Sequence, residues 1–367
     1  MFERCYNVQY HIKFSDNKGD IIMKGRKLSW MVLFMVFALV LAACGGTDTS
    51  KESHSSSDDA IDEGKTYTFK AGHSQTEEHP YHLALLDLAE NVKERTDGKV
   101  TIEIFPLNQL GAERELTEAL TLGTADMSIS STAPIANFYP QIGIVDLPFL
   151  FESREHAYSV LDGQVGQDLL SGMEEVGLMG LAWAENGFRH ITNSKHPITK
   201  PEDLQGLKIR TQENQIHLDA FNALGAQPTP MAWNEALTAL QQGVVDAQEN
   251  PLIIADTYKL FDSNQKYMTL TGHIYSPAVV MFSKSVWDTL PSEYQDILKE
   301  EAKIAGDKVR ELSTKADTDS LQVVKDAGME VIEDVDVQPF RDALQSVFEK
   351  YEKDFGKENI EAILNGN

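Results

Sequence analysis

Arg210 is the side chain whose position in this sequence most favours ligand chemistry. The run Leu207–Thr211 has the pattern of a short strand, and Arg210 lies at its carboxyl end, before a helix expected to begin near Glu213. Ligands of α/β sheets collect outside the carboxyl ends of strands, and a helix N-terminus adds N–H donors and a positive partial charge. A guanidinium can bind a carboxylate through two parallel hydrogen bonds. The position therefore predicts an anion site, with an exposed or salt-bridged arginine as the alternative.

Three further side chains could complete such a site. Asn250 follows a strand expected at 244–248, and its amide can donate a hydrogen bond to a carboxylate. Trp233 precedes a helix expected at 234–242 and could form an apolar wall, although core packing fits its spacing equally well. Arg189 lies near the first place where the chain could cross between two lobes. It could bind a second acidic or hydroxyl group, or it could hold the lobes together.

Most enzyme chemistry is excluded by the residues that the chain lacks. The sequence has no G-x-x-x-x-G-K-S/T, G-x-G-x-x-G, H-E-x-x-H or G-x-S-x-G motif, and its two cysteines, Cys5 and Cys44, lie near the N-terminus. His79 and His82 could share a metal, but two histidines without a third ligand are more typical of a surface or pocket rim. Carboxylate pairs such as Glu113 with Glu115 are expected on solvated faces. We expect no catalysis, no metal and no cofactor.

The elements that position these residues alternate between short apolar runs and amphipathic helical patterns. Strands are expected at 67–71, 100–105, 127–130, 178–183, 190–193, 207–211 and 244–248, and helices at 80–95, 113–122, 213–224 and 234–242. This alternation predicts an α/β fold with mainly parallel sheets.

A long helical pattern indicates how the fold is divided. Small or apolar residues recur at steps of three and four from Ser292 to Ala327, and Ser292 with Gln295 has the spacing of a capping box. A helix of this length is about 50 Å long. A lobe of half the chain has a diameter of only about 35 Å. The helix is therefore expected to run along two lobes joined by a hinge.

The N-terminal region has the layout of an export signal. An apolar run, Met31–Ala43, follows three basic residues and is too short to cross a membrane, which needs about 20 residues. The run ends in Leu-Ala-Ala-Cys, which resembles a bacterial lipobox, so Cys44 is the expected lipidation site. Residues 1–43 are then a signal peptide, with Met23 as the expected true start, and 44–64 form a flexible lipidated tether. The net charge of −25 argues against nucleic acid as a partner.

An ordered series of motifs resembles the solute-binding subunits of tripartite ATP-independent periplasmic (TRAP) transporters, the C4-dicarboxylate-binding family. The similarity runs from about residue 66 to the C-terminus. The motifs are QLG at 109–111, DLPF at 146–149, NGFR at 186–189, GLKIR at 206–210, LGAQPTPM at 224–231, WNE at 233–235 and ALQQGVVDAQENP at 239–251.

The resemblance implies a two-lobed, hinged, periplasmic-binding-protein-like α/β fold braced by the long helix. Lobe I would comprise 65–186 plus 276–315, and lobe II would comprise 187–275 plus 316–367. By motif, Arg210 matches the principal carboxylate-binding arginine. The other implied ligand-binding positions are Arg189, Asn250, Trp233, the loop residues His73, Ser74 and Gln75, and Ser131, which replaces the glutamate of sialic-acid-binding members. Glu213 is near enough to accept a ligand hydroxyl.

The implied function is capture of a small organic acid, a C4-dicarboxylate or a sugar acid, for a TRAP membrane permease. The protein would be a lipid-anchored monomer on the extracytoplasmic face of the cell membrane. Two other classes stay open: a ligand-sensing lipoprotein that signals to a membrane kinase, and a lipid-anchored hydrolase or lyase on the same fold.

Overall fold

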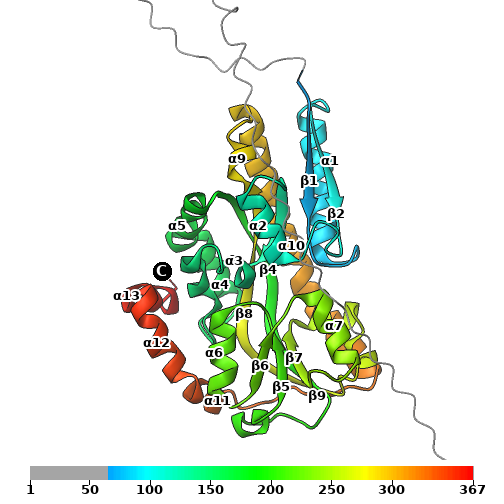
Figure 1. Cartoon of the computed structure of the whole chain (residues 1–367), viewed down its shortest axis with the longest axis vertical. Helices are drawn as coiled ribbons and strands as arrows, with labels where there is room; N and C mark the ends of the chain where they lie inside the picture. The colour runs from blue at the N-terminus through cyan, green and yellow to red at the C-terminus, as the bar shows by residue number, and fades with distance from the viewer. Residues whose placement is uncertain (1–64, 367) are drawn as a thin grey trace, which may run out of the picture. The chain divides into compact units, whose positions relative to one another are not determined.

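The computed structural model describes residues 65–366, and its strands form one mixed sheet. Within this range the sheet has nine strands, in the order β2-β1-β3-β8-β4-β7-β5-β6, with β9 paired to β8 (Figure 1). The strand bounds are β1 Tyr67–Gly72, β2 Val100–Phe105, β3 Met127–Ser131, β4 Leu178–Asn193, β5 Lys208–Thr211, β6 Gln227–Pro230, β7 Ala247–Asn250, β8 Tyr267–Ser283 and β9 Glu330–Ile332. The predicted signal peptide, Cys44 and the tether lie outside the described residues.

Two groups of parallel strands are joined by a long antiparallel pair. Strands β2, β1 and β3 run parallel, and so do β7, β5 and β6. Between them β4 and β8 pair antiparallel along most of their length, with register shifts between Gly180 and Ala182, Glu185 and Gly187, and Arg189 and Ile191. The expectation of mainly parallel sheets is therefore wrong for the centre of the sheet. The runs expected at 178–183 and 190–193 are parts of one continuous strand, β4.

The helices that the sequence predicted lie close to their expected positions. Helix α1 occupies Pro80–Arg95, as predicted, because its apolar face repeats with helical spacing and packs under β2 and against α10. The other helix bounds are α2 Glu113–Thr121, α3 Thr132–Ile135, α4 Arg154–Asp162, α5 Gln164–Gly172, α6 Gln215–Ala223, α7 Trp233–Gln241, α8 Leu252–Thr257, α9 Lys284–Trp287, α10 Ser292–Asp326, α11 Gln338–Ala343, α12 Gln345–Phe355 and α13 Lys357–Leu364.

The predicted long helix is confirmed as α10. It packs against α1, against β4 and, further along, against α8 (Figure 1). Its buried residues belong to two separate hydrophobic clusters, with Leu298 and Val309 in one and Val324 in the other. The predicted capping box is wrong, because Ser292 is already the first helical residue and Gln295 Nε2 instead donates to the carbonyl oxygen of Trp287 (3.0 Å). No helix among the described residues has the length and apolar character needed to cross a membrane.

Candidate ligand-binding pocket

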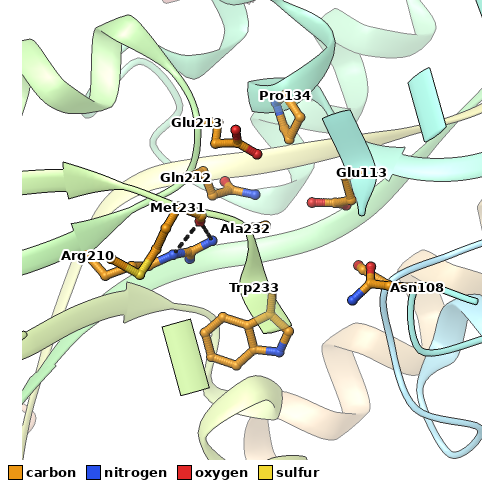
Figure 2. Close-up of a pocket in the computed structure, with 10 residues that line it drawn as sticks. Asn108, Glu113, Pro134, Arg210, Gln212, Glu213, Met231, Ala232 and Trp233 are labelled. Carbon is orange, nitrogen blue, oxygen red and sulfur yellow. Dashed lines mark hydrogen bonds between the residues drawn. The ribbon is translucent and has the colours of Figure 1, made fainter. Parts of the chain in front are cut away.

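Polar residues from both parallel groups of strands line one pocket. Arg210, Gln212 and Glu213 come from the end of β5 and the turn that follows, and Met231, Ala232 and Trp233 come from the segment that opens α7. The opposite wall includes Asn108, Glu113 and Pro134 (Figure 2), and Ser74, which follows β1, also lines the pocket. The pocket has about 260 Å³ of space, part of it open to solvent.

Arg210 is a buried cation without a nearby counter-ion. Only 3% of its surface is exposed, and Nε and Nη2 both donate to the carbonyl oxygen of Met231 (3.0 and 2.8 Å). No carboxylate of the described residues approaches within the 4.0 Å of an ion pair. Burial lowers the pKa of Arg210 to about 10, so the guanidinium stays charged at neutral pH. Arg210 is thus a charged side chain at the pocket whose charge no carboxylate of the described residues balances at ion-pair distance.

The turn after Arg210 is built differently from the prediction. Helix α6 begins at Gln215, and the Asn214 side chain caps it by accepting hydrogen bonds from the backbone N–H groups of residues 216 and 217. Glu213 therefore precedes the helix. It lines the pocket with its side chain 28% exposed, 3.9 Å from the guanidinium of Arg114. Its backbone carbonyl accepts a hydrogen bond from Asn137 Nδ2 (2.6 Å).

Trp233 serves both of the roles expected for it. It is the first residue of α7, it lines the pocket, and its ring lies 5.3 Å from the guanidinium carbon of Arg210. The same side chain is buried in a hydrophobic cluster and meets Tyr258 edge to face at 5.2 Å. The indole therefore holds Arg210 through a cation–π contact while the core fixes its own orientation.

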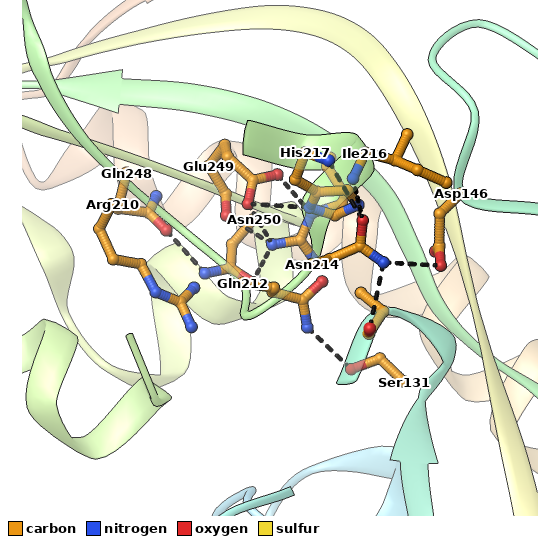
Figure 3. Close-up of polar contacts among 12 residues, drawn as sticks. Ser131, Asp146, Arg210, Gln212, Asn214, Ile216, His217, Gln248, Glu249 and Asn250 are labelled. Carbon is orange, nitrogen blue, oxygen red and sulfur yellow. Dashed lines mark hydrogen bonds and ion pairs between the residues drawn. The ribbon is translucent and has the colours of Figure 1, made fainter. Parts of the chain in front are cut away.

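Arg189 and Asn250 lie outside the pocket lining and form a buried ion-pair cluster. Arg189 Nε donates to Glu249 Oε2 (2.5 Å), and Nη2 donates to Glu249 Oε1 (2.9 Å) and to Asn250 Oδ1 (3.1 Å). Asn250 is the last residue of β7, and its Nδ2 donates to Gln248 Oε1 (2.6 Å; Figure 3). Desolvation alone would raise the pKa of Glu249, but Arg189 and His273 outweigh it and hold this pKa below its usual range. Arg189 Nη1 is buried and has no hydrogen-bond partner among the described residues.

Glu113 is a pocket residue that the sequence reasoning placed on a solvated face. It begins α2, where the helix N-terminus favours a negative charge. Its carboxylate accepts from the backbone N–H and hydroxyl of Ser131 (both 3.0 Å), and Ser131 Oγ also accepts from Gln212 Nε2 (2.9 Å; Figure 3). Burial raises the pKa of Glu113, while the Ser131 hydrogen bonds and the charge of Arg210 oppose that rise. Ser131 thus connects the two walls of the pocket.

The loop 73–75 after β1 brings one of its three predicted residues to the pocket. Ser74 lines it, and Gln75 Nε2 donates to Ser74 Oγ (3.0 Å). His73 is buried behind, with its Nε2 3.0 Å from Nδ1 of His82. His79 instead caps α1 by accepting from the backbone N–H of residue 81. The described residues contain no group of three or more side chains placed to hold a metal ion.

Comparison with known proteins adds the family. The family model described as bacterial extracellular solute-binding protein, family 7, matches residues 71–354. A solute-binding protein from Verminephrobacter eiseniae is 45% identical over 285 residues, which are 77% of this chain and 84% of that protein.

Two solved structures resemble the fold closely. A TRAP periplasmic solute-binding protein from a Polaromonas species, bound to D-erythronate, has a TM-score of 0.80 and 42% identity, with 81% of this chain and 98% of that chain covered. The sugar-acid-binding protein DctPAm from Advenella mimigardefordensis, in complex with galactonate, has a TM-score of 0.79 and 35% identity, with 82% and 98% covered.

Fold and pocket together define a two-lobed solute-binding protein. The chain belongs to the family-7 extracellular solute-binding proteins, the DctP family, whose members include the solute-binding subunits of TRAP transporters. These proteins are extracytoplasmic and bind solutes rather than transform them. The expectations of a TRAP-type binding subunit and of no enzymatic activity are therefore confirmed.

Proposed function

We propose that this protein captures a small hydroxylated organic acid, of the sugar-acid type, for a TRAP permease. The observation that carries the proposal is Arg210, a buried guanidinium with no carboxylate within ion-pair distance among the described residues. A ligand carboxylate would supply the missing charge in a site where water is scarce and charge pairing is strong.

Acceptor oxygens on both walls of the pocket favour ligand hydroxyl groups over a second ligand carboxylate. Glu113 and Glu213 are hydrogen-bond acceptors in this pocket, and Gln212 has a buried Oε1 without a partner among the described residues. These oxygens can accept from ligand hydroxyls, whereas a second ligand carboxylate would meet two like charges. The D-erythronate and galactonate of the two similar structures are hydroxylated monocarboxylates.

The remaining predicted site residues are proposed to form a layer of polar side chains behind the walls of the pocket. Arg189 Nη1 and Asn250 would extend the donor surface beyond Arg210, and Ser131, His73 and Gln75 would hold Glu113 and Ser74 in place. Their burial and mutual hydrogen bonds support these roles.

The proposal is tested by calorimetry of the Arg210→Ala variant with D-erythronate and galactonate. We expect a loss of at least about 2–4 kcal/mol of binding free energy, since the ligand carboxylate is left desolvated and unpaired. Arg210→Lys should also bind poorly, because an ammonium cannot reproduce the two parallel bonds. Arg95→Ala is the matched control, because it removes ion pairs to Glu300 and Glu301 outside the pocket. Affinity of Arg210→Ala equal to wild type would refute the assignment.

Closure of two lobes, 65–186 plus 276–315 and 187–275 plus 316–367, is proposed to enclose the ligand. The boundary between Asn186 and Gly187 supports this division, because the register of β4 and β8 shifts there and Gly187 has a φ of +123°. A hinge at this point would let the two parallel groups of strands move against each other.

We also propose that the mature protein is a lipid-anchored monomer that begins at Cys44, with translation starting at Met23. The lipobox-like sequence before Cys44 supports the anchor. Cells that produce the Cys44→Ser variant should show the protein outside the membrane fraction, and wild-type protein should be in it. An unchanged membrane fraction for the variant would contradict the anchor.

A further inference from the structure

Tyr258 connects the two walls of the pocket from outside the pocket lining. It directly follows α8, which itself follows β7 in one parallel group of strands. Its hydroxyl donates to the backbone carbonyl of Ser74 (3.1 Å), which follows β1 in the other parallel group. The hydrogen bond therefore joins segments that follow strands of the two parallel groups, and its acceptor Ser74 lines the pocket.

The same side chain also contacts the wall that holds Arg210. The Tyr258 ring meets Trp233 edge to face at 5.2 Å, and Trp233 lies under the Arg210 guanidinium at 5.3 Å. Trp233 Nε1 is buried and has no hydrogen-bond partner among the described residues. One phenol thus touches the aromatic wall on one side of the pocket and the backbone of loop 73–75 on the other.

Helix α8 gives Tyr258 a fixed support. Ser320 Oγ of α10 donates to Asp256 Oδ2 of α8 (2.8 Å), and the two helices pack together. The chain then turns sharply, with Lys259 in the left-handed region at a φ of +48°. The ring is therefore held on the α10 side while its hydroxyl reaches across to Ser74.

We infer that Tyr258 is a positioning residue that slows ligand release by holding loop 73–75 against the Trp233 wall in the closed protein. Opening the lobes must break the hydrogen bond between Tyr258 and Ser74, whereas a ligand entering the open protein does not meet it. The residue therefore acts on dissociation and leaves association nearly unchanged.

The test compares Tyr258→Phe with wild type in stopped-flow tryptophan fluorescence, with D-erythronate as the probe. The variant keeps the ring and its packing but loses the hydroxyl. We expect the dissociation rate to rise about 2- to 10-fold, the range of one neutral hydrogen bond, with an association rate within about two-fold of wild type. Thr257→Val is the matched control, because its hydroxyl donates only to Ile253 within α8 (2.8 Å).

A second readout separates this role from the proposed function on which it rests. In ligand-free protein this hydrogen bond forms whenever the lobes close. Amide hydrogen exchange of segment 73–79 without ligand should therefore be faster in Tyr258→Phe than in wild type or Thr257→Val, with unfolding midpoints alike. If D-erythronate does not bind wild type, the proposed ligand class fails and the exchange alone decides the role of Tyr258. Unchanged dissociation with unchanged exchange, or equal changes in Thr257→Val, would overturn the inference.

Discussion

Two buried arginines in this protein differ in how their charge is balanced. Arg189 forms a bidentate ion pair with Glu249, so its charge is already compensated inside the protein. Arg210 has only a backbone carbonyl and the face of Trp233, which are weaker partners than a carboxylate. Stranding a buried charge is costly, and a ligand anion relieves that cost only at Arg210. Arg189 holds Glu249 and Asn250 behind the pocket through its Nε and Nη2 groups, and its Nη1 is the group proposed to extend the donor surface.

A selectivity change at Glu113 is the prediction that belongs to single residues. Glu113→Gln removes a negative charge from the wall opposite Arg210 while keeping a carbonyl oxygen that can accept from Ser131. We expect affinity for galactonate to fall by about 5- to 20-fold, as one charged hydrogen bond is weakened. Affinity for a dicarboxylate such as succinate should rise or stay constant, because one repulsion is removed.

Calorimetry with both ligands measures this change. Glu115→Gln provides the comparison, since this nearby carboxylate is exposed and accepts from the backbone N–H of Ala112 (3.0 Å) instead of facing the pocket. Equal losses for both ligand classes in Glu113→Gln would contradict the assigned role.

The sequence predicted pocket residues whose place depends on local pattern and missed six others, among them Glu113, whose burial depends on distant partners. Arg210 and Glu213 follow a strand in an α/β pattern, so their place at the sheet edge could be expected. Glu113 has the local appearance of a surface carboxylate. Its burial follows from Ser131, 18 residues away, and from Arg210 and Gln212 on the other wall, which no local spacing encodes.

At the scale of elements, α10 is held against the sheet by a very close approach at Gly306. A Cβ at this position would lie 2.3 Å from the carbonyl oxygen of Trp183 in β4. Glycine inside a helix normally destabilises it by about 1 kcal/mol relative to alanine. Here the absence of a side chain lets the helix backbone rest on the strand.

Gly306→Ala should therefore destabilise the protein in spite of alanine's higher helix propensity. We expect a net loss of about 1–3 kcal/mol in the free energy of unfolding, because the clash involves backbone atoms that cannot rotate away. Urea unfolding followed by circular dichroism measures this loss. Thr318→Ala, at an exposed position of the same helix, should be neutral or slightly stabilising. A gain in stability for Gly306→Ala would show that the contact with Trp183 is not tight.

The sequence predicted half-buried elements better than fully buried ones. Helices α1 and α10 have one apolar face and one polar face, which periodicity detects. Strand β8 is buried along most of its length, so no alternation marks it, and Gly272 and Pro277 interrupt its pattern. Because the sequence did not predict β8, the expected sheet lacked its antiparallel centre.

For the whole molecule, buried histidines dominate the expected response to acid. Desolvation lowers the pKa of four of them to about 3, whereas the same side chains in the unfolded chain have the ordinary value of 6.5; they are His73, His79, His190 and His217. The unfolded chain therefore binds more protons between these two pKa values. The stabilisation that comes from keeping these histidines neutral is fully present above pH 6.5. It decreases as the pH falls below that value. Burial raises the pKa of Asp146 to about 7 and also raises the pKa values of Glu113 and Asp317, which has the opposite sign but involves fewer groups.

The free energy of unfolding should thus fall by at least about 2 kcal/mol between about pH 7.5 and about pH 5. Urea titrations at several pH values measure this change. His190→Gln should flatten the dependence, since it removes one of the four groups, and His196→Gln, at an exposed position, is the comparison variant. A stability that rises toward pH 5 would mean that Asp146 outweighs the histidines.

The long antiparallel pair of β4 and β8 has a consequence for how the chain folds. Strand β8 pairs with β3 as well as with β4, so the sheet that begins at residue 67 lacks its central partner until residue 283 has been made. Contacts of such large sequence separation are slow to form and leave strand edges unpaired in the meantime. The nascent chain should therefore stay incompletely folded through most of its synthesis. A slow-folding precursor of this kind suits passage across a membrane in the unfolded state, with folding completed on the far side.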